Sequence, residues 1–481
     1  MHSVVSERKQ AIVLASIILV LIAVNIPRLQ FNLFWCDECF SITSVQSFSK
    51  VIERALWDAG AHPPLYLFML YAHCQIFGYS PVSYQLYAMI PWILIMIVGA
   101  TFIRKRFGFA SALIFILLST FLKFSVRFEM EVRSYEWCAL FVLICYIYLL
   151  KILEDRKARD YCIFTAFSIL SAYSHYYCAM AIAFFYLVLI IDSLTHHKEE
   201  IKRVSIMSAI TIVAYVPWII IAFKSILYLS HSFWKKTYLT PLECMGLIFD
   251  SPIGLGFVLF LVMILFTVLI IMNNMKENDN KACTMDIWII AGLLSIGGSI
   301  FIATIVSLAV TPILVDRYLY PVSIVAWLLL SYSVINYWKT NTGAMKKAAT
   351  IMIAAILITG IPYFIINYSN EIHNENLTEE TLNDLSEIEQ MNNPLILSNI
   401  RDFDSDKGEI GYYFPSVPAS VYDTNTLQQL KSDTQYYLFI EGMIDDETIT
   451  VLNDNGYTYE MMSEKAQLDM YKFCAYRLIP L

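Results

Sequence analysis

The feature of this sequence that most constrains its fold is a succession of long apolar runs separated by short basic loops. Hydrophobic residues make up 58% of the 481 residues, and charged residues make up only 15%. Soluble domains carry about 25% charged residues, and a helix needs roughly 17 to 25 apolar residues to cross a bilayer. The sequence therefore predicts a polytopic α-helical membrane protein.

We expect about eleven membrane spans, oriented by the Lys and Arg content of the short loops between them. If the N-terminus is cytoplasmic, every second loop is short and basic or mixed, as in "RKRFG" and "HHKEEIKR". This is typical of cytoplasmic loops, and it places the C-terminal end outside the cytoplasm. The predicted spans are 11–26, 84–103, 109–126, 137–153, 161–173, 178–191, 204–227, 253–272, 287–310, 319–338 and 348–366.

Two segments are assigned by the same charge pattern. The stretch "HPPLYLFMLYAHCQIFG" offers only a short apolar run after Pro64, and a crossing there would move every later basic loop outside. We therefore predict a juxtamembrane helix on the outer surface, which Pro63 and Pro64 suit as a helix start. The segment 161–192 is basic on both flanks and must be a hairpin, with its outer turn near His175.

The C-terminal part differs from the rest in charge and pattern. Residues 367–481 contain 21 Asp and Glu and 6 Lys and Arg, which leaves 20 acids and 27 bases for residues 1–366. The strand-like segments "NPLILSNI", "QYYLFIEG" and "MYKFCAYRLI" alternate with helix-like ones such as "DETITVLNDNG". We predict a transmembrane domain over 1–366 and a small extracytoplasmic α/β domain over 367–481. A basic excess confined to loops beside an acidic tail excludes nucleic acid as a partner.

A set of polar residues breaks the apolar pattern at one predicted membrane face. Charges at an interface are costly, so they tend to be paired or to bind a ligand. Two adjacent carboxylates lie in the first outer loop, and arginines, histidines and tyrosines lie at later outer positions. The candidate site residues are Asp37, Glu38, His62, Arg133, Tyr135, His175, Tyr176, Arg317 and Tyr318.

The order and spacing of five motifs carry a family resemblance. They are "WCDECFS", "HPPLYLFML", "EVRSYEW", "SHYYCAMA" and "DRYLYPV". Each motif alone is weak, but the five together resemble the lipid-phosphate-sugar-dependent glycosyltransferases of the GT-C fold, which include protein O-mannosyltransferases and the lipid A aminoarabinose transferase. The resemblance covers nearly the whole membrane part. It implies an inverting glycosyltransferase of the plasma membrane that acts on the outer face.

The resemblance also implies roles for particular residues. Asp37 matches the catalytic aspartate and Glu38 its neighbour, His62 matches the histidine of the His-Pro-Pro motif, and Arg133 and Arg317 match the phosphate ligands. The implied donor is a polyprenyl-phosphate sugar, and the implied acceptor is a cell-envelope glycan, lipid or protein. A carboxylate within about 3 Å of the acceptor hydroxyl can act as general base. Guanidinium groups bind the departing phosphate bidentately.

Structural alternatives stand beside these roles. Asp37 and Glu38 would also serve as helix-capping acids, and the two arginines would also pair with neighbouring acids. The histidines would also be satisfied interfacial residues, and Tyr176 would also belong to an aromatic belt.

Cys36-x-x-Cys39 is compatible with free thiols, a disulfide or a metal site that lacks a second CxxC pair. The pattern requires no cofactor, but a divalent cation on the acid pair and His62 fits the resemblance. Lys235 and Lys236 would contact a phosphate or lipid headgroups.

Two rival functions remain open from the sequence. Within the enzyme class, the chain would transfer another lipid-carried group or a whole lipid-linked glycan. From another class, it would be a transporter or flippase of a lipid-linked substrate. Transporters place ionisable residues near the bilayer midplane on broken helices, often in repeats. Here the charges gather at one predicted face and we find no repeat, which favours the transferase.

Overall fold

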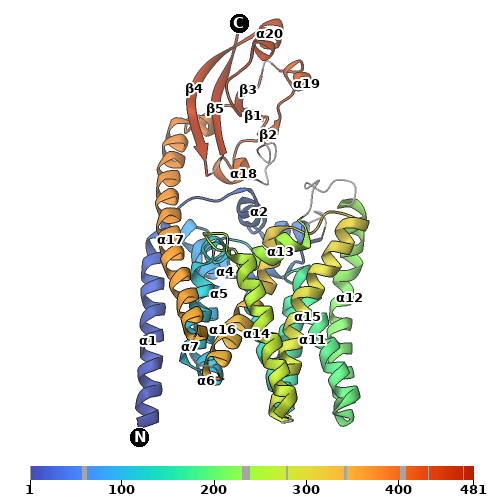
Figure 1. Ribbon diagram of the computed structural model, residues 1–481. Helices are drawn as coiled ribbons and strands as arrows, with labels where there is room; N and C mark the ends of the chain where they lie inside the picture. The colour runs from blue at the N-terminus through green and yellow to red at the C-terminus, as the bar shows by residue number, and fades with distance from the viewer. Residues whose placement is uncertain are drawn as a thin grey trace. The chain divides into compact units, whose positions relative to one another are not determined.

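The computed structural model describes residues 2–56, 62–229, 239–277, 280–340, 344–400, 403, 408–431, 433–469 and 471–481. The chain forms two compact units (Figure 1). The first, the helical unit, contains Met1–Ile26, Ile52–Met69 and Leu86–Phe364. The second, the mixed unit, contains Pro27–Val51, Leu70–Gln85 and Ile365–Leu481. The division at residue 366 stays a prediction, and the mixed unit adds two N-terminal segments to the C-terminal part.

Helices make up the first unit and link it to the second along the chain. Their bounds are α1 His2–Asn25, α3 Phe48–Leu56, α4 Leu65–Phe77, α5 Pro81–Val98, a π-helical turn Gly99–Ile103, α6 Arg104–Phe107, α7 Phe109–Phe121, α8 Lys123–Phe128, α9 Tyr135–Asp155, α10 Ala158–Ala172, α11 Tyr176–Thr195, η3 Lys198–Glu200, α12 Ile201–Leu229, α13 Pro241–Leu247, α14 Gly256–Glu277, α15 Asn280–Ala309, η4 Asp316–Leu319, α16 Tyr320–Thr340 and α17 Ala344–Asp384.

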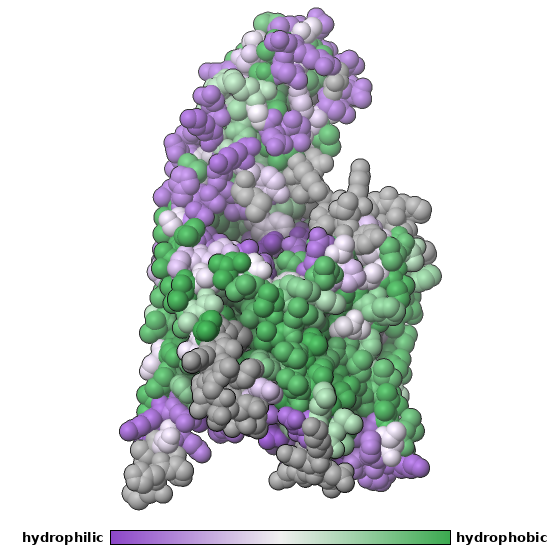
Figure 2. All heavy atoms as spheres, viewed as in Figure 1, coloured by the Kyte–Doolittle hydropathy of each residue, from purple (hydrophilic) through white to green (hydrophobic). Residues whose placement is uncertain are grey.

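Eight helices in the described part of the chain are long and apolar enough to cross a membrane, which confirms the polytopic helical fold class. On the face that Figure 2 shows, hydrophobic side chains cover the middle of the helical unit, and hydrophilic ones lie at the ends of its helices. Three predicted spans are not among the eight. The span 109–126 is divided between α7, of 13 residues, and α8. The span 161–173 corresponds to α10, of 15 residues, and 348–366 lies inside α17.

The two segments assigned by charge have the predicted local structure. The helix after Pro63 and Pro64 is α4, whose 13 residues are fewer than a span requires. The hairpin consists of α10 and α11, and its turn includes His175. The side of the bilayer on which this turn lies stays a prediction, and so does the side of every other loop.

The mixed unit is built on a five-stranded sheet in the order β2-β1-β3-β5-β4. The strands are β1 Pro394–Ser398, β2 Ala419–Val421, β3 Gln435–Ile440, β4 Tyr457–Leu468 and β5 Tyr471–Pro480. β1 pairs in parallel with β2 and β3, whereas β5 is antiparallel to β3 and β4. The predicted strands at β1, β3 and β5 are present, and β2 and β4 were not predicted.

Besides the parts of α3, α4, α5 and α17 that fall within it, the described part of the mixed unit contains four short helices. They are α2 Cys36–Ser44, α18 Glu409–Tyr413, α19 Thr424–Leu427 and α20 Asp446–Asp454. Two 3-10 turns, η1 Ile26–Gln30 and η5 Ile388–Gln390, join the longer elements. The core beside the sheet includes Leu397, Leu438, Leu452 and Tyr476, all 0–1% exposed.

Candidate functional site

A cluster of aromatic rings from three separate elements forms the centre of the candidate site in the helical unit. The His62 and His175 rings lie 4.9 Å apart, centroid to centroid. The Tyr318 ring is 5.4 Å from His62 and 4.9 Å from His175, and meets both at steep angles. The structure therefore brings together three predicted site residues that are far apart in the sequence.

Backbone contacts at helix ends hold these rings in place. The Leu65 N–H, at the start of α4 after the two prolines, donates to the Tyr173 carbonyl at the end of α10. His175 is the N-cap of α11, and its Nδ1 accepts a bond from the Tyr177 N–H at 3.2 Å. The Tyr177 hydroxyl donates to the Ile313 carbonyl at 2.9 Å, just before η4. The cluster is thus built from a helix start, a helix cap and a short turn.

The positive charges of two arginines influence the two histidines of the cluster. Arg133, which is 8% exposed, lies in the turn between α8 and α9, and Arg317 is half-buried in η4. Burial, together with the charges of Arg133 and Arg317, lowers the pKa of His175 to about 3. Burial, His175 and the same two guanidinium charges also lower the pKa of His62 well below its usual value. Both imidazoles are therefore neutral at pH 7, and the positive charge belongs to the arginines.

Each imidazole keeps one ring nitrogen without a hydrogen-bond partner among the described residues. These atoms are His62 Nδ1 and His175 Nε2, and both are buried. Unpartnered buried polar atoms are uncommon in proteins, because leaving one unsatisfied costs about 1–3 kcal/mol. Neutral imidazole nitrogens beside two guanidinium groups can hydrogen-bond the oxygens of a phosphate ester.

A third arginine in this region, Arg127, is paired with an acidic side chain. Glu129 and Glu131 are buried, and Glu131 Oε2 lies 3.3 Å from Arg127 Nε. Burial would lower the pKa of Arg127, but the nearby carboxylates of Glu131 and Asp316 outweigh it and raise this pKa. The Glu131 carboxylate therefore pairs with Arg127.

The remaining predicted residues differ in how closely they join the cluster. The Tyr135 ring is 6.1 Å from that of His175. Tyr176 is half-buried at the first position of α11. The ring from this helix that contacts the cluster is Tyr177, which lies 5.7 Å from His175 and 5.9 Å from Tyr318. Its place beside His175 in "SHYYC" was the only sequence signal for it.

Sequence reasoning also missed a buried hydrogen bond between Tyr320 and Glu136. The Tyr320 hydroxyl donates to Glu136 Oε1 at 2.5 Å, and both residues are nearly inaccessible. Glu136 follows Tyr135, and Tyr320 follows the η4 turn that carries Tyr318. The bond therefore joins the start of α9, which carries Tyr135, to the start of α16, which directly follows the η4 turn.

The acid pair lies in the mixed unit, on the first turn of α2. Glu38 is 6% exposed, and its Oε2 accepts a bond from the Trp35 N–H at 3.4 Å, which caps the helix. Asp37 is half-buried one residue earlier. The helix-capping alternative therefore applies to Glu38.

The cysteines that flank the acid pair, Cys36 and Cys39, form no disulfide within the described part of the chain. Cys39 is buried, and its thiol donates to the Phe34 carbonyl at 3.0 Å. Burial, with Glu409 and Glu38 nearby, raises the pKa of this thiol well above its usual value.

In the described part of the chain, no group of three His, Cys, Asp or Glu side chains could hold a metal ion. Lys235 and Lys236 lie outside the described residues.

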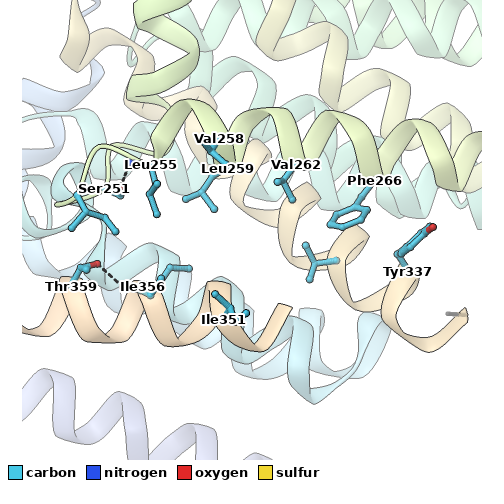
Figure 3. A pocket seen from close by; sticks show the side chains of 13 residues that line it. Ser251, Leu255, Val258, Leu259, Val262, Phe266, Tyr337, Ile351, Ile356 and Thr359 are labelled. Atoms are coloured by element: carbon cyan, nitrogen blue, oxygen red, sulfur yellow. Dashed lines mark hydrogen bonds between the residues drawn. The ribbon is translucent and has the colours of Figure 1, made fainter. Parts of the chain in front are cut away.

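An apolar groove of about 350 Å³ lies between α14, α16 and α17 in the helical unit. Figure 3 shows side chains of α14, such as Val262, facing those of α17, such as Ile356. One end of the groove is at Ser251, next to Asp250, whose Oδ1 lies 3.6 Å from Lys123 Nζ. The groove therefore offers a hydrocarbon-lined space that ends at an ion pair.

Comparison with solved structures identifies the fold. The chain is similar to crystal structures of ArnT from Cupriavidus metallidurans in the apo state and bound to undecaprenyl phosphate. The TM-scores are 0.58 and 0.61 at 13% and 14% identity, and each alignment covers 97% of both chains. This chain has the GT-C fold. No family model matches the sequence, and no curated protein matches it.

The GT-C fold extends over both units, because the alignments cover nearly the whole chain. The family resemblance read from the five motifs is thereby confirmed for the fold. Those motifs supply His62, Arg133, His175, Arg317 and Tyr318 to the helical unit, and the acid pair to the mixed unit.

Because the pKa values of His62 and His175 are lowered, we expect the folded protein to lose stability in acid. The unfolded chain protonates a histidine near pH 6.5, whereas folded His175 stays neutral down to about pH 3. The unfolded state thus binds more protons between these values, and the free energy of unfolding should fall as pH falls, by about 1 kcal/mol per pH unit. His175→Asn keeps a capping acceptor and should reduce the slope of melting temperature between pH 7 and pH 5.

The matched control for this measurement is His373→Asn, because His373 is exposed on α17. This variant should retain the full slope of the unmodified protein. An unchanged slope in His175→Asn would contradict a neutral imidazole at this position.

Proposed function

We propose that this protein is an inverting glycosyltransferase that moves a monosaccharide from a polyprenyl-phosphate carrier to an acceptor hydroxyl. The observation that carries the proposal is the pair of guanidinium groups, Arg133 and Arg317, acting on two buried neutral imidazoles that have unpartnered ring nitrogens. The GT-C fold supports the reaction class. ArnT, which shares the fold, has been crystallised with undecaprenyl phosphate.

The proposed reaction is a single displacement at the anomeric carbon. The Asp37 carboxylate takes the proton of the acceptor hydroxyl, and the acceptor oxygen forms a bond to the anomeric carbon. The bond from that carbon to the phosphate oxygen breaks, and the polyprenyl phosphate leaves with the electron pair. Arg133 and Arg317 stabilise the charge that develops on the phosphate. One displacement inverts the anomeric configuration.

The residues around the phosphate have distinct proposed tasks. His62 and His175 donate or accept hydrogen bonds as neutral groups, and Tyr318 packs against both rings. Tyr135 and Tyr176 line the sugar side of the site. Glu38 holds the first turn of α2 through its bond to Trp35, so Asp37 is the better candidate for the base.

The proposed setting is the plasma membrane, with the N-terminus in the cytoplasm and the reaction on the outer face. The short basic loops of the helical unit support this orientation. The acceptor is a glycan, lipid or protein of the cell envelope, and the protein contacts membrane lipids along its apolar helices. A divalent cation on the acid pair is not needed for the proposed displacement, because the two arginines supply the charge.

The test supplies membranes from cells that express the protein with a panel of radiolabelled polyprenyl-phosphate sugars. Label should leave one donor for another fraction, with inversion at the anomeric carbon. Membranes without the protein serve as the control. Movement of labelled lipid across the bilayer without transfer would favour a flippase, and transfer only of longer glycans would favour a glycan ligase.

The apolar groove predicts a specific defect in donor binding. A polyprenyl chain would occupy the groove, so Val262→Trp should exclude at least one branched hydrocarbon unit, whose burial contributes about 1.5–3 kcal/mol. The Michaelis constant for the donor should rise about tenfold to a hundredfold with kcat unchanged. Initial rates against donor concentration measure both. Val268→Trp, on the exposed part of α14, should leave both values as they are.

Equal kinetics for the Val262 and Val268 variants would contradict this role for the groove. That result would not bear on the proposed phosphate ligands Arg133 and Arg317. The groove variants test the Michaelis constant for the donor, whereas the arginine variants test the rate of transfer.

A further inference from the structure

The stretch just before α2 has no secondary structure of its own. The 3-10 turn η1 ends at Gln30, α2 begins at Cys36, and residues 31–35 between them are irregular. Every backbone N–H and carbonyl of such a stretch needs a partner from elsewhere in the fold or from water. In the mixed unit, the partners of the Asn32 backbone and of the Phe34 N–H come from α17 and α18, hundreds of residues later in the sequence.

The central contact is the hydroxyl of Tyr413 on α18. This buried hydroxyl accepts a bond from the Phe34 N–H at 3.1 Å and donates to the Asn32 carbonyl at 2.8 Å. The neighbouring Tyr412 donates to Asn32 Oδ1 at 2.5 Å, and its ring meets that of Phe34 edge-on at 5.2 Å. Two adjacent tyrosines therefore satisfy the backbone and fix the direction of this stretch.

Helix α17 holds the other end of the same stretch. The Arg28 guanidinium, which is almost buried, donates to both carboxylate oxygens of Glu371 at 2.7 and 2.8 Å. The Asn32 N–H donates to the Glu375 carboxylate at 2.9 Å. Bidentate guanidinium–carboxylate pairs fix orientation as well as distance. The stretch is thus held at both ends by side chains of the C-terminal part.

The held stretch sets the first turn of α2 directly. The Phe34 carbonyl accepts the Cys39 thiol, and the Trp35 carbonyl accepts the N–H groups of Glu38 and Cys39 at 2.8 and 3.0 Å. α18 packs against α2 (Figure 1). Asp37 lies in this turn, two residues after Trp35, so any movement of residues 32–35 moves its backbone.

We propose that the C-terminal part of this chain positions the acid-pair helix, with Tyr413 and Tyr412 as positioning residues for Asp37. This inference rests on the proposed function, in which Asp37 is the base. It gives the C-terminal domain a role in catalysis that does not require contact with a substrate. A base displaced by about 1 Å can cost on the order of a hundredfold in rate.

The experiment compares Tyr413→Phe with Tyr476→Phe in the full-length protein. Tyr476 is an equally buried tyrosine of the same domain, and its hydroxyl accepts a bond from the Ile444 N–H at 3.2 Å. Both variants lose one buried hydroxyl that serves the backbone, but only Tyr413 touches the stretch before α2. Transfer kinetics and hydrogen exchange of the α2 amides are measured for each.

Tyr413→Phe should lower kcat by about tenfold to a hundredfold, leave the Michaelis constant for the donor unchanged and speed amide exchange in α2 at least about tenfold. Tyr476→Phe should leave kcat per folded molecule and α2 exchange unchanged. If Tyr413→Phe does not fold, Tyr412→Phe removes the milder half-buried contact and should change the same two quantities in the same direction.

Unchanged kcat and unchanged α2 exchange in Tyr413→Phe would overturn the inference, as would equal effects of Tyr476→Phe. Faster α2 exchange in a protein that transfers no sugar even when unmodified would support the positioning of α2 and overturn the proposed function instead. The two failures are therefore distinguishable.

Discussion

Asp37→Asn is expected to lower sugar transfer by about 10²- to 10⁴-fold, because asparagine keeps the shape of the side chain but cannot accept the acceptor's proton. The loss should fall on kcat, with the donor's Michaelis constant nearly unchanged, because the proton is transferred only in the transition state. Initial rates with the identified donor, in membranes matched for the amount of protein, measure the effect.

The neighbouring acid provides the matched control. Glu38→Gln keeps an acceptor oxygen for the Trp35 N–H, so α2 should stay capped and the rate should fall less than about tenfold. A larger loss in Glu38→Gln than in Asp37→Asn would move the base to Glu38. Equal rates for Asp37→Asn and the unmodified protein would remove the acid pair from the chemistry.

Arg133→Lys and Arg317→Lys should each reduce transfer by about 10²- to 10³-fold. Lysine keeps the positive charge but lacks the planar fork that binds two phosphate oxygens, and removal of one well-placed donor at a developing anion has an effect of this size. The charges of both arginines act on the buried imidazoles of His62 and His175. Rates and donor affinity, measured separately, test the prediction.

Arg127→Lys is the control for charge without phosphate contact. Arg127 is the more exposed arginine, with 43% of its side chain accessible, and it pairs with Glu131. Its conservative replacement keeps the positive charge beside Glu131 and should change transfer less than about threefold. A loss in Arg127→Lys as large as in Arg133→Lys would show that the phosphate lies elsewhere in this charged region.

The local elements of the helical unit could be predicted from the sequence because each depends on neighbouring residues. Long apolar runs must be helices in a bilayer, since no water is present to satisfy the backbone. The paired prolines mark the start of α4, and the basic flanks of 161–192 indicate a hairpin that is present as α10 and α11. The same logic overestimated α7, which ends at Phe121, because apolar composition does not measure where a helix ends.

In the mixed unit, strand propensity identified β1, β3 and β5 but missed β4. The pattern of β4, "YTYEMMSEKAQL", has charged residues in its exposed middle, and only one of its long edges is paired, with β5. A strand of this kind is stabilised by its partner and not by its own hydrophobic alternation. Its existence is therefore a property of the sheet.

The sequence by itself determined that this chain is a polytopic membrane protein, that polar motifs recur at one end of its spans, and that an acidic α/β segment follows. Only the tertiary structure decided that His62, His175 and Tyr318 share one ring cluster, that Glu38 caps its own helix, and that Tyr413 holds the backbone before Asp37. The reason is physical: helix formation and membrane insertion depend on local composition, whereas buried polar atoms take whichever partner the packing of distant segments brings within about 3 Å.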